Sequence, residues 1–358
     1  MASNIEVSRS RAQVTEHHIE NTAYTKYPGN YYGKDDSWNL EAFKEACKIA
    51  IQRYHRGIEL EIDICGVGPA VANAYRRIMI AEVPTMAIEH CFIYNNTSVI
   101  QDEMLAHRMG MIPIRANPTK FQWRDKKEGP ESTRADLTIV FTLKTKCEKK
   151  PDADPDKSGR REDLYTNYRV LSGHLKWKPI PGQEKIFVDK DTLRPVHKDI
   201  LIAKLSGKQE LDLRLHAVKG IGRDHAKFSP VATASYRLMP DIKLKEKITG
   251  EAAERLAECF SKGVIELQGP AKKAVVVNPR IDTGSRNVFR YADLKDKVEY
   301  DLIKDHFLFT VESTGCIPAL DILLQSCDIL ESKCEYFLQE IKSCRSRIDQ
   351  LAPVIESI

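Results

Sequence analysis

The sequence has no long apolar run, and its charges nearly cancel. Nowhere do about 18 apolar residues follow one another, which is the length that a membrane-spanning helix needs. The 55 Lys and Arg residues are almost matched by 51 Asp and Glu residues, which leaves a net charge of +4. So small an excess does not by itself indicate binding to nucleic acid. We therefore expect no membrane partner, and no nucleic-acid binding as the main function.

The sequence also lacks closely spaced cysteine pairs. Its nine cysteines include no Cys-x-x-Cys pair, so the usual spacing of zinc ligands is missing. An odd number of cysteines without local pairing is typical of a reducing compartment. The polar first residues, MASNIEVSRSRAQ, have no apolar core of a signal peptide. These features predict an intracellular chain with free thiols, most of them buried, and no bound metal or other cofactor.

Complete catalytic motifs are missing as well. Gly66 and Gly68 follow an alternating segment in the manner of a dinucleotide-binding loop, but Val71 occupies the position of the required third glycine. His225 has Asp and Ser neighbours, yet no G-x-S-x-G nucleophile turn exists. The remaining histidines are scattered singly, whereas zinc ligands come in close pairs. We expect that the chain is not an enzyme.

The strongest pattern that is present lies in residues 57–89. Apolar residues alternate from Ile58 to Ile64, which predicts a strand with one buried face. A glycine turn follows, and a helix is expected from Pro69 to Glu82, because Pro is favoured at the first helical position and a second Pro follows its end. Four residues form a narrow apolar seam on this helix, which suits a partner helix: Val71, Ala74, Ile78 and Ala81.

A second pattern occupies the end of the chain, where a long helix is predicted after Pro318. Apolar residues recur there at alternating steps of three and four, as in a heptad seam: Leu320, Leu323, Cys327, Leu330, Cys334, Phe337 and Ile341. The helix could pack on its own domain, on a partner chain, or partly on each. We favour a partner chain because the apolar stripe is longer than an ordinary domain helix requires.

The other segments predict a mixed α and β chain. Residues 1–37 are polar and without a sustained period, so an extended N-terminal arm is expected. Charge and proline content predict a mobile surface loop at 146–163. Helices are expected at 39–54, 102–109 and 251–260, a loop at 219–237, and strands at 88–94, 137–143, 168–171, 196–205, 211–217, 274–277 and 307–311.

Four stretches of the chain together resemble a known family. They read NAYRRIMIAEVPTMAIE within 71–89, DEMLAHRMGMIPI at 102–114, KGIGRDHAKFSPVAT at 219–233 and FLFTVESTGCIPALDILLQSCDIL at 307–330. In this order they are similar to the alpha-like subunits of cellular RNA polymerases. The resemblance spans most of the chain.

This resemblance implies an α+β fold with two domains. A dimerisation domain, made of a sheet and two long interface helices, would comprise residues 38–95 and 298–358. An inserted, mostly β second domain would comprise residues 96–297. The implied partner is a smaller alpha-like polymerase subunit. The first and last helices would form the dimer interface, which would consist of the residues of the two seams given above and Tyr75.

The family role is that of an assembly platform, with catalysis and its magnesium on the large subunits. The resemblance implies contacts with the second-largest and largest subunits and with small zinc-binding subunits, and DNA would be met only through the assembled complex. The residues that match the contacting segments are Arg76, Arg77, His107, Arg108, Arg223, His225, Lys227 and Phe228.

Two segments bear on which polymerase is meant. The polymerase II relative carries zinc-binding cysteines in a region that matches residues 121–135, where this chain has none. Residues 277–289, VNPRIDTGSRNVF, resemble the subunit that polymerases I and III share. We therefore expect a role in the synthesis of rRNA, 5S rRNA and tRNA, in the nucleolus and nucleoplasm of the nucleus. The equivalent polymerase II subunit is the alternative, and a nucleic-acid-binding module is a further one.

Overall fold

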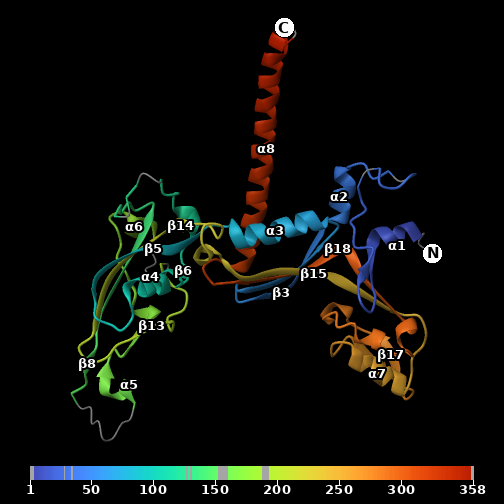
Figure 1. The fold of residues 1–358 in the computed structure, drawn as a ribbon, viewed down its shortest axis with the longest axis horizontal. Coiled ribbons are helices and arrows are strands. Elements are labelled where there is room, and N and C mark those ends of the chain that lie inside the picture. The colour runs from blue at the N-terminus through green and yellow to red at the C-terminus, as the bar shows by residue number, and fades with distance from the viewer. Residues whose placement is uncertain are drawn as a thin grey trace. The chain divides into compact units, whose positions relative to one another are not determined.

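The structure, a computed structural model, describes residues 4–27, 29–33, 35–125, 128–129, 131–151, 160–187 and 193–355. The chain forms two compact units, each built from several chain segments (Figure 1). Unit 1 comprises residues 1–54, 60–74 and 235–310, and unit 2 comprises residues 55–59, 75–234 and 311–358. Both contain helices and sheets, which confirms the α+β class. The unit limits differ from the domain limits that the family resemblance implies, and the latter stay a prediction.

A six-stranded sheet organises unit 1. Its path is β2-β1-β18-β4-β3, and β15 also pairs with β18. The strands are β1 (Arg11–Val14), β2 (Ile19–Glu20), β3 (Lys48–His55), β4 (Glu59–Cys65), β15 (Val231–Leu244) and β18 (Val298–Ser313). The alternation of residues 58–64 predicted β4, and the alternation of 307–311 predicted part of the much longer β18. Leu60, Ile62 and Ile64 are buried, as the alternation requires.

The N-terminal segment is folded onto this sheet, which differs from the extended arm expected for residues 1–37. Helix α1 (Asn4–Ser10) leads into β1, which pairs with β18 in antiparallel register, with Ala12 opposite Leu302. The buried Lys304 ammonium donates hydrogen bonds to the carbonyl oxygens of Ser8 at 2.6 Å and Ala23 at 2.9 Å. These bonds satisfy a buried cation with main-chain acceptors and tie the segment to β18.

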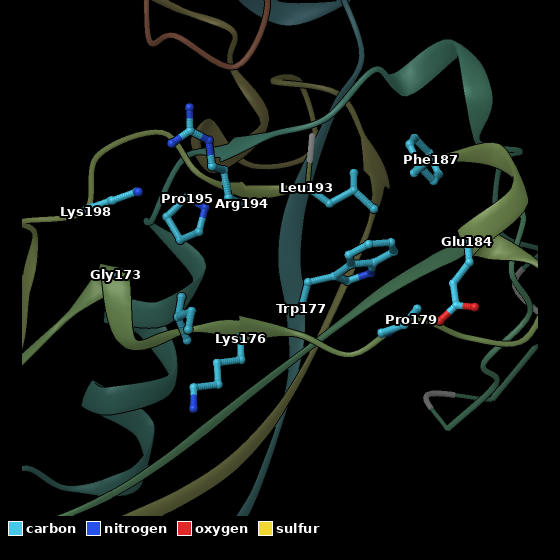
Figure 2. A pocket seen from close by; sticks show the side chains of 11 residues that line it. Gly173, Lys176, Trp177, Pro179, Glu184, Phe187, Leu193, Arg194, Pro195 and Lys198 are labelled. Atoms are coloured by element: carbon cyan, nitrogen blue, oxygen red, sulfur yellow. The ribbon is translucent and has the colours of Figure 1, made fainter. Parts of the chain in front are cut away.

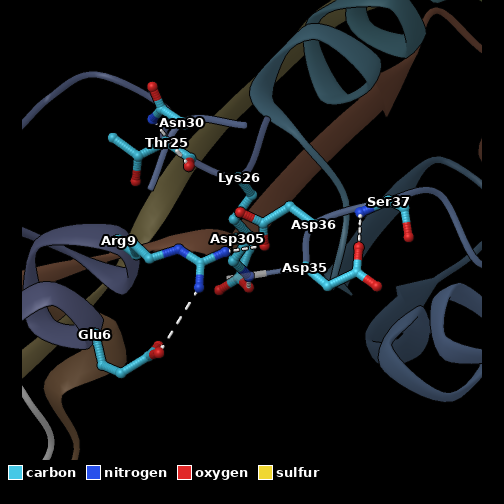
Figure 3. Close-up of polar contacts among 9 residues, drawn as sticks. All are labelled: Glu6, Arg9, Thr25, Lys26, Asn30, Asp35, Asp36, Ser37 and Asp305. Carbon is cyan, nitrogen blue, oxygen red and sulfur yellow. Dashed lines mark hydrogen bonds and ion pairs between the residues drawn. The ribbon is translucent and has the colours of Figure 1, made fainter. Parts of the chain in front are cut away.

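Ion pairs add to this attachment (Figure 3). The Arg9 guanidinium pairs with the Asp36 carboxylate and lies 3.7 Å from the Glu6 carboxylate. The Lys26 ammonium pairs with the Asp305 carboxylate on β18. Because Asp305 follows Lys304, one short stretch of β18 holds the N-terminal segment at several points.

The helix predicted over residues 39–54 is wrong beyond its first half. Helix α2 (Leu40–Ala46) is capped by the Asn39 side chain, which accepts hydrogen bonds from the amides of Glu41 and Ala42. From Lys48 the chain continues as strand β3. The apolar residues of 47–51 fit a period of two as well as a helical one. The β-branched Ile49 and Ile51 and the aromatic Tyr54, which follow the end of α2, favour a strand.

Gly66 makes the turn from β4 to helix α3 (Pro69–Ala81), whose bounds agree with the prediction. Its φ is +77°, and a Cβ at this position would lie 2.2 Å from the carbonyl oxygen of Ala46. Only glycine fits such a position without movement of the backbone.

Gly66→Ala is therefore expected to lower the free energy of unfolding by about 2–4 kcal/mol, because strain at positive φ and a backbone clash add together. Thermal unfolding of the purified protein measures the effect. Gly29→Ala is the control, since Gly29 also has a positive φ but no atom within 4 Å of a Cβ. Equal losses in both variants would contradict the role of the close approach.

Asp301 on β18 is a buried carboxylate in unit 1. Burial, together with the nearby Glu299 and Asp241 carboxylates, raises the pKa of Asp301 to about 6. The folded state thus favours the protonated form, whose stabilising effect is complete below the unfolded pKa near 4 and is lost as the pH rises through 6.

We expect Asp301→Asn to raise the free energy of unfolding by about 1–3 kcal/mol at pH 7.5 and to have little effect at pH 4. Urea unfolding at the two pH values measures this difference. A gain that is the same at both pH values would show that ionisation of Asp301 is not its cause.

Helix α7 and a hairpin complete unit 1. Helix α7 (Glu251–Cys259) packs with β16 (Ile265–Gln268) and β17 (Lys273–Val276) around a second apolar cluster that includes Leu256 and Val264. The following segment, 277–289, is anchored by hydrogen bonds from Arg237 to the carbonyl oxygens of Arg280 and Asp282. The sequence predicted α7 and β17.

The four-stranded sheet of unit 2 has the order β11-β7-β14-β5. Helix α4 (Asp102–Gly110) buries Leu105 and Met109 in the apolar cluster of this sheet. The strands are β5 (Thr85–Asn96), β7 (Thr138–Lys146), β11 (Lys176–Trp177) and β14 (Glu210–Gly220). The smaller pairs are β6 (Ile114–Arg115) with β12 (Arg194–Pro195), β8 (Glu148–Lys149) with β9 (Tyr165–Thr166), and β10 (Arg169–Leu171) with β13 (Leu201–Lys204).

Two loop predictions meet different outcomes. The loop expected at 219–237 is shorter, because β14 continues to Gly220 and β15 begins at Val231. Of the mobile loop predicted at 146–163, residues 152–159 lie outside the described residues. The remaining short helices are α5 (Arg161–Leu164), α6 (Gln183–Ile186), η1 (Pro118–Lys120), η2 (Ser172–His174), η3 (Ala226–Phe228), η4 (Pro279–Ile281), η5 (Asn287–Arg290) and η6 (Lys295–Lys297).

Helix α8 (Ala319–Ile355) ends the described chain and belongs to unit 2. Its 37 residues form one continuous helix, about 55 Å long at 1.5 Å per residue (Figure 1). Among the helices that the structure describes, α8 included, none combines the length and the apolar character needed to span a membrane.

Candidate subunit interface

Burial changes sharply along α8. Its first turns are anchored in unit 2, where Ala319, Ile322 and Ser326 are fully buried. From residue 331 to residue 342 every side chain is exposed. An isolated helix gains little stability from its own hydrogen bonds, and most helical stability in proteins comes from packing. The exposed part of α8 therefore has the character of a helix that packs against another chain.

The exposed part of α8 carries large apolar side chains. Phe337 is 64% exposed and Ile341 is 63% exposed, and both belong to the predicted seam. Of the other seam residues, Cys327 and Cys334 are exposed, Leu320 and Leu330 are half-buried, and Leu323 is buried. The seam is thus divided along the helix, because its first turn packs on the chain itself and its later turns do not.

Among the described side chains of α8, which end at residue 345, three exposed large apolar residues lie outside the predicted seam: Leu324, Tyr336 and Leu338. Each of the two leucines comes one position after one seam residue and three positions before the next. Leu324 and Leu338 therefore widen the apolar stripe on one side. A search for a broad helical stripe in place of a strict heptad seam would have identified them from the sequence.

The seam of α3 is divided in a similar way. Val71 is 39% exposed, whereas Ile78, two turns later, is 2% exposed. Ala74, Tyr75 and Ala81 are half-buried. Almost all of the Ile78 side chain is covered by the protein's own atoms, so it has little surface left for a partner.

The second half of α3 and the start of α8 meet within unit 2. The Tyr75 hydroxyl and the Cys327 thiol are hydrogen-bonded. Glu82, immediately after α3, accepts a hydrogen bond of 2.5 Å from the Lys333 ammonium. Helices α3 and α8 therefore contact each other here, which the spacing of the seams did not predict.

The loop after β14 packs against the end of α3. A Cβ on Gly222 would lie 2.3 Å from the carbonyl oxygen of Ile80, and the Arg223 amide donates a hydrogen bond of 2.8 Å to the Ala81 carbonyl. The Arg223 side chain is exposed. Because the loop touches α3 through its backbone, its charged side chains stay available to other molecules.

Lys227 and Phe228 serve the fold of unit 2. The Lys227 ammonium donates a hydrogen bond of 3.0 Å to the Ile88 carbonyl and forms an ion pair with Glu89. It also lies 5.2 Å from the centre of the Phe228 ring, and Phe228 is buried. Both residues were expected at a subunit contact. Their side chains are largely used within the chain.

The other expected contact residues are mostly exposed. His107, Arg108, Arg223 and His225 are exposed, as is Arg77, whereas Arg76 is half-buried. The Arg108 guanidinium donates to the carbonyl oxygens of Leu201 and Ile202, so α4 is tied to β13 by a side chain that remains accessible.

The polar residues near His225 do not form a catalytic arrangement. The His225 Nδ1 atom accepts a hydrogen bond of 3.1 Å from the Lys227 amide, which caps η3. The Ser229 hydroxyl donates to the Val231 carbonyl at 3.2 Å. Each side chain therefore satisfies local backbone, and the two do not bond to each other. Within the described part of the chain, no group of three or more His, Cys, Asp or Glu residues is placed to hold a metal ion.

All nine cysteines are free thiols. The expectation that most are buried is wrong, because two are buried, four are half-buried, and Cys327, Cys334 and Cys344 on α8 are exposed. The apolar pattern around these three belongs to the part of the helix that its own unit does not cover. Cys147 and Cys259 are buried, and burial raises the pKa of Cys91 to about 11.

A cavity of about 670 Å³ lies elsewhere in unit 2 (Figure 2). Trp177, Phe187 and Leu193 form its apolar wall. The charged residues that line it are Lys176, Glu184, Arg194 and Lys198. Its described lining residues include no His, Cys or Ser, so the side chains that most often serve as nucleophile or base are missing from them.

Comparison with known proteins agrees with this arrangement. Residues 61–334 match the family model of the RNA polymerase Rpb3/Rpb11 dimerisation domain. The chain is 48% identical to the human DNA-directed RNA polymerases I and III subunit RPAC1, over 94% of this chain and 96% of the human protein. It is 41% identical to the Saccharomyces cerevisiae protein of that name, over 91% and 96% of the two chains.

A relative with another name is less similar. The Arabidopsis thaliana DNA-directed RNA polymerases II, IV and V subunit 3 is 35% identical over 74% of this chain and 82% of its own length. The match to the family model, over residues 61–334, covers both α3 and the greater part of the apolar seam of α8. The chain belongs to the family of alpha-like RNA polymerase subunits that contain the Rpb3/Rpb11 dimerisation domain.

Proposed function

We propose that this chain is a non-catalytic assembly subunit of DNA-directed RNA polymerases I and III. The observation that carries the proposal is the exposed apolar stripe on α8, in a chain with the polymerase dimerisation domain. Monomeric proteins seldom expose a long continuous apolar surface, and such a surface marks an interface. The relatives named as subunits of polymerases I and III support the choice of complex.

The partner at this stripe is a smaller alpha-like subunit. The contact is made by the exposed seam residues of α8 and by the exposed part of α3, with Phe337 and Ile341 as anchors. Large apolar anchors at the centre of an interface contribute most of its affinity. The dimerisation domain comprises residues 38–95 and 298–358, and residues 96–297 form the inserted domain.

The heterodimer is a platform for the larger subunits. Arg77 of α3, His107 and Arg108 of α4, and Arg223 and His225 of the loop after β14 present exposed polar groups to the largest and second-largest subunits and to small zinc-binding subunits. DNA is met only through the assembled complex. The chain is expected in the nucleus, in the nucleolus for rRNA synthesis and in the nucleoplasm for 5S rRNA and tRNA synthesis.

The test is purification of the tagged full-length chain from cells under native conditions, with identification of the proteins that accompany it in stoichiometric amount. We expect a smaller alpha-like chain together with the large subunits of polymerases I and III. A monomer that recovers no polymerase chain would overturn the proposal. Recovery of polymerase II alone would keep the family and overturn the choice of complex.

A nucleic-acid-binding module is the remaining alternative. Of the basic pairs in the sequence, Lys272 is engaged in an ion pair with Glu254. The pair Lys126 and Lys127 lies outside the described residues. Duplex binding by the purified heterodimer, with an affinity that falls steeply as salt is raised, would favour this alternative.

A further inference from the structure

Strand β3 (Lys48–His55) forms the outer edge of the six-stranded sheet in unit 1 (Figure 1). It pairs with β4 on one side, and no strand of the described chain pairs with its other side. All eight of its residues are exposed. Ile49 is 62% exposed and Ile51 is 56% exposed. β3 therefore offers both a free backbone edge and apolar side chains to another molecule.

An uncovered edge strand can pair with other chains and cause aggregation. Natural proteins protect edge strands by making them short, by placing charged residues, proline or bulges in them, or by covering them. β3 has charged residues at Lys48 and Arg53, but the two isoleucines between them are exposed. β3 has eight residues and contains neither Pro nor Gly. Its length, together with its exposed isoleucines, favours coverage by another chain.

The charges of this edge select the chain that covers it. Lys48 and Arg53 lie on β3, His55 ends it and Arg56 follows, and no Asp or Glu occurs from Ala46 to Ile58. Two carboxylates of β4 lie close to this strand: Asp63 accepts a hydrogen bond of 3.0 Å from the Gln52 side chain, and Glu61 lies 3.8 Å from Arg53. Arg53 and Glu61 are both substantially exposed, so their attraction is weak. A second copy of β3 would bring basic residues against basic residues, which is unfavourable. An acidic strand would be attracted.

Further apolar surface adjoins the start of the strand. Trp38 and Leu40 are exposed, and the Trp38 ring packs on Phe43 of α2 with ring centres 5.1 Å apart. One residue, Cys47, separates the end of helix α2 from the start of β3. A strand placed on β3 could therefore continue onto an aromatic surface that belongs to the same unit.

We propose that β3 is a docking edge on which an extended, acidic segment of another polymerase chain adds a strand. Main-chain hydrogen bonds would supply affinity, and alternating apolar and acidic side chains would supply specificity. The proposal rests on the proposed function for the class of partner. The site is distinct from α8, because it accepts an extended segment and not a helix.

The test uses the full-length chain in cells with a photo-crosslinking amino acid at Ile51, followed by mapping of the crosslinked peptides. Leu267 on β16 is the control position, because it is also an exposed apolar strand residue of unit 1. We expect Ile51 to give at least tenfold more crosslink than Leu267, to one acidic segment of another polymerase subunit. Crosslinks to a second copy of this chain, to nucleic acid, or at the control level would overturn the proposal.

Charge reversal gives an independent measurement on the same complex. Lys48→Glu combined with Arg53→Glu is expected to reduce the Ile51 crosslink at least tenfold and to leave recovery of the α8 partner unchanged. Lys262→Glu combined with Lys273→Glu, which changes two exposed lysines of unit 1 by the same charge, should have no effect. An unchanged crosslink in the β3 variant would overturn the proposal.

The outcomes also separate the two proposals. If the polymerase assembles but β3 crosslinks to nothing, the docking edge is wrong and the assembly function stands. If no polymerase chain is recovered at all, the assembly function is wrong and the docking edge fails with it.

Discussion

Phe337→Asp combined with Ile341→Asp is expected to abolish stable association with the partner chain and to leave this chain folded. Both side chains are more than three-fifths exposed, so the fold does not depend on them. In the heterodimer they would lie in a dry seam, where an unpaired carboxylate costs several kcal/mol. A loss of about 3 kcal/mol or more corresponds to at least a hundredfold weaker binding.

Co-purification of the tagged double variant with the smaller alpha-like subunit measures this loss, and circular dichroism checks the helix content. Gln339→Asp is the matched control, because Gln339 is exposed on the opposite side of the same helix from Phe337 and Ile341. It adds the same group without entering the seam, so partner recovery should stay normal. Normal recovery with the double variant would show that the exposed stripe of α8 is not the dimer interface.

The sequence pattern predicted α8 and its apolar seam but not which part of the seam is covered. Leu323 and Phe337 lie about four helical turns apart in one regular period, yet the first is buried and the second is exposed. Periodicity reports only which face of a helix is apolar. Whether the chain itself or a partner covers that face depends on contacts with distant segments, which local spacing does not contain.

Local sequence predicted the secondary structure correctly where it clearly favoured one conformation, and incorrectly where it was compatible with two. Gly66 and Pro69 set the turn and the start of α3, and the structure has both as predicted. Residues 47–54 allowed either a helix or a strand. Pairing with β4 decided in favour of the strand, as tertiary contacts commonly override propensity.

The candidate contact residues illustrate a further limit. Lys227 and His225 lie two positions apart in a segment that resembles the family's contact region. The Lys227 ammonium donates a hydrogen bond to the Ile88 carbonyl and pairs with the Glu89 carboxylate, whereas the His225 side chain is exposed. A resemblance identifies the segment, but the three-dimensional contacts decide which side chains in it can reach another subunit.

Ile78→Asp is the second change with a large expected effect, and the predicted mechanism is unfolding. Ile78 is 2% exposed, so its replacement would leave a carboxylate without solvent or a partner inside unit 2. The lost apolar contacts add to this, and the free energy of unfolding should fall by about 4 kcal/mol or more. We expect little soluble protein and a strongly lowered melting temperature.

Val71→Asp is the matched control for this change. Val71 lies seven residues before Ile78 on the same helix, so the two have nearly the same angular position, but Val71 is 39% exposed. The Val71 variant should keep its melting temperature within a few degrees, because its carboxylate can remain hydrated. If the Ile78 variant instead kept a normal melting temperature and lost only its partner, Ile78 would be an interface residue and the burial argument would be wrong.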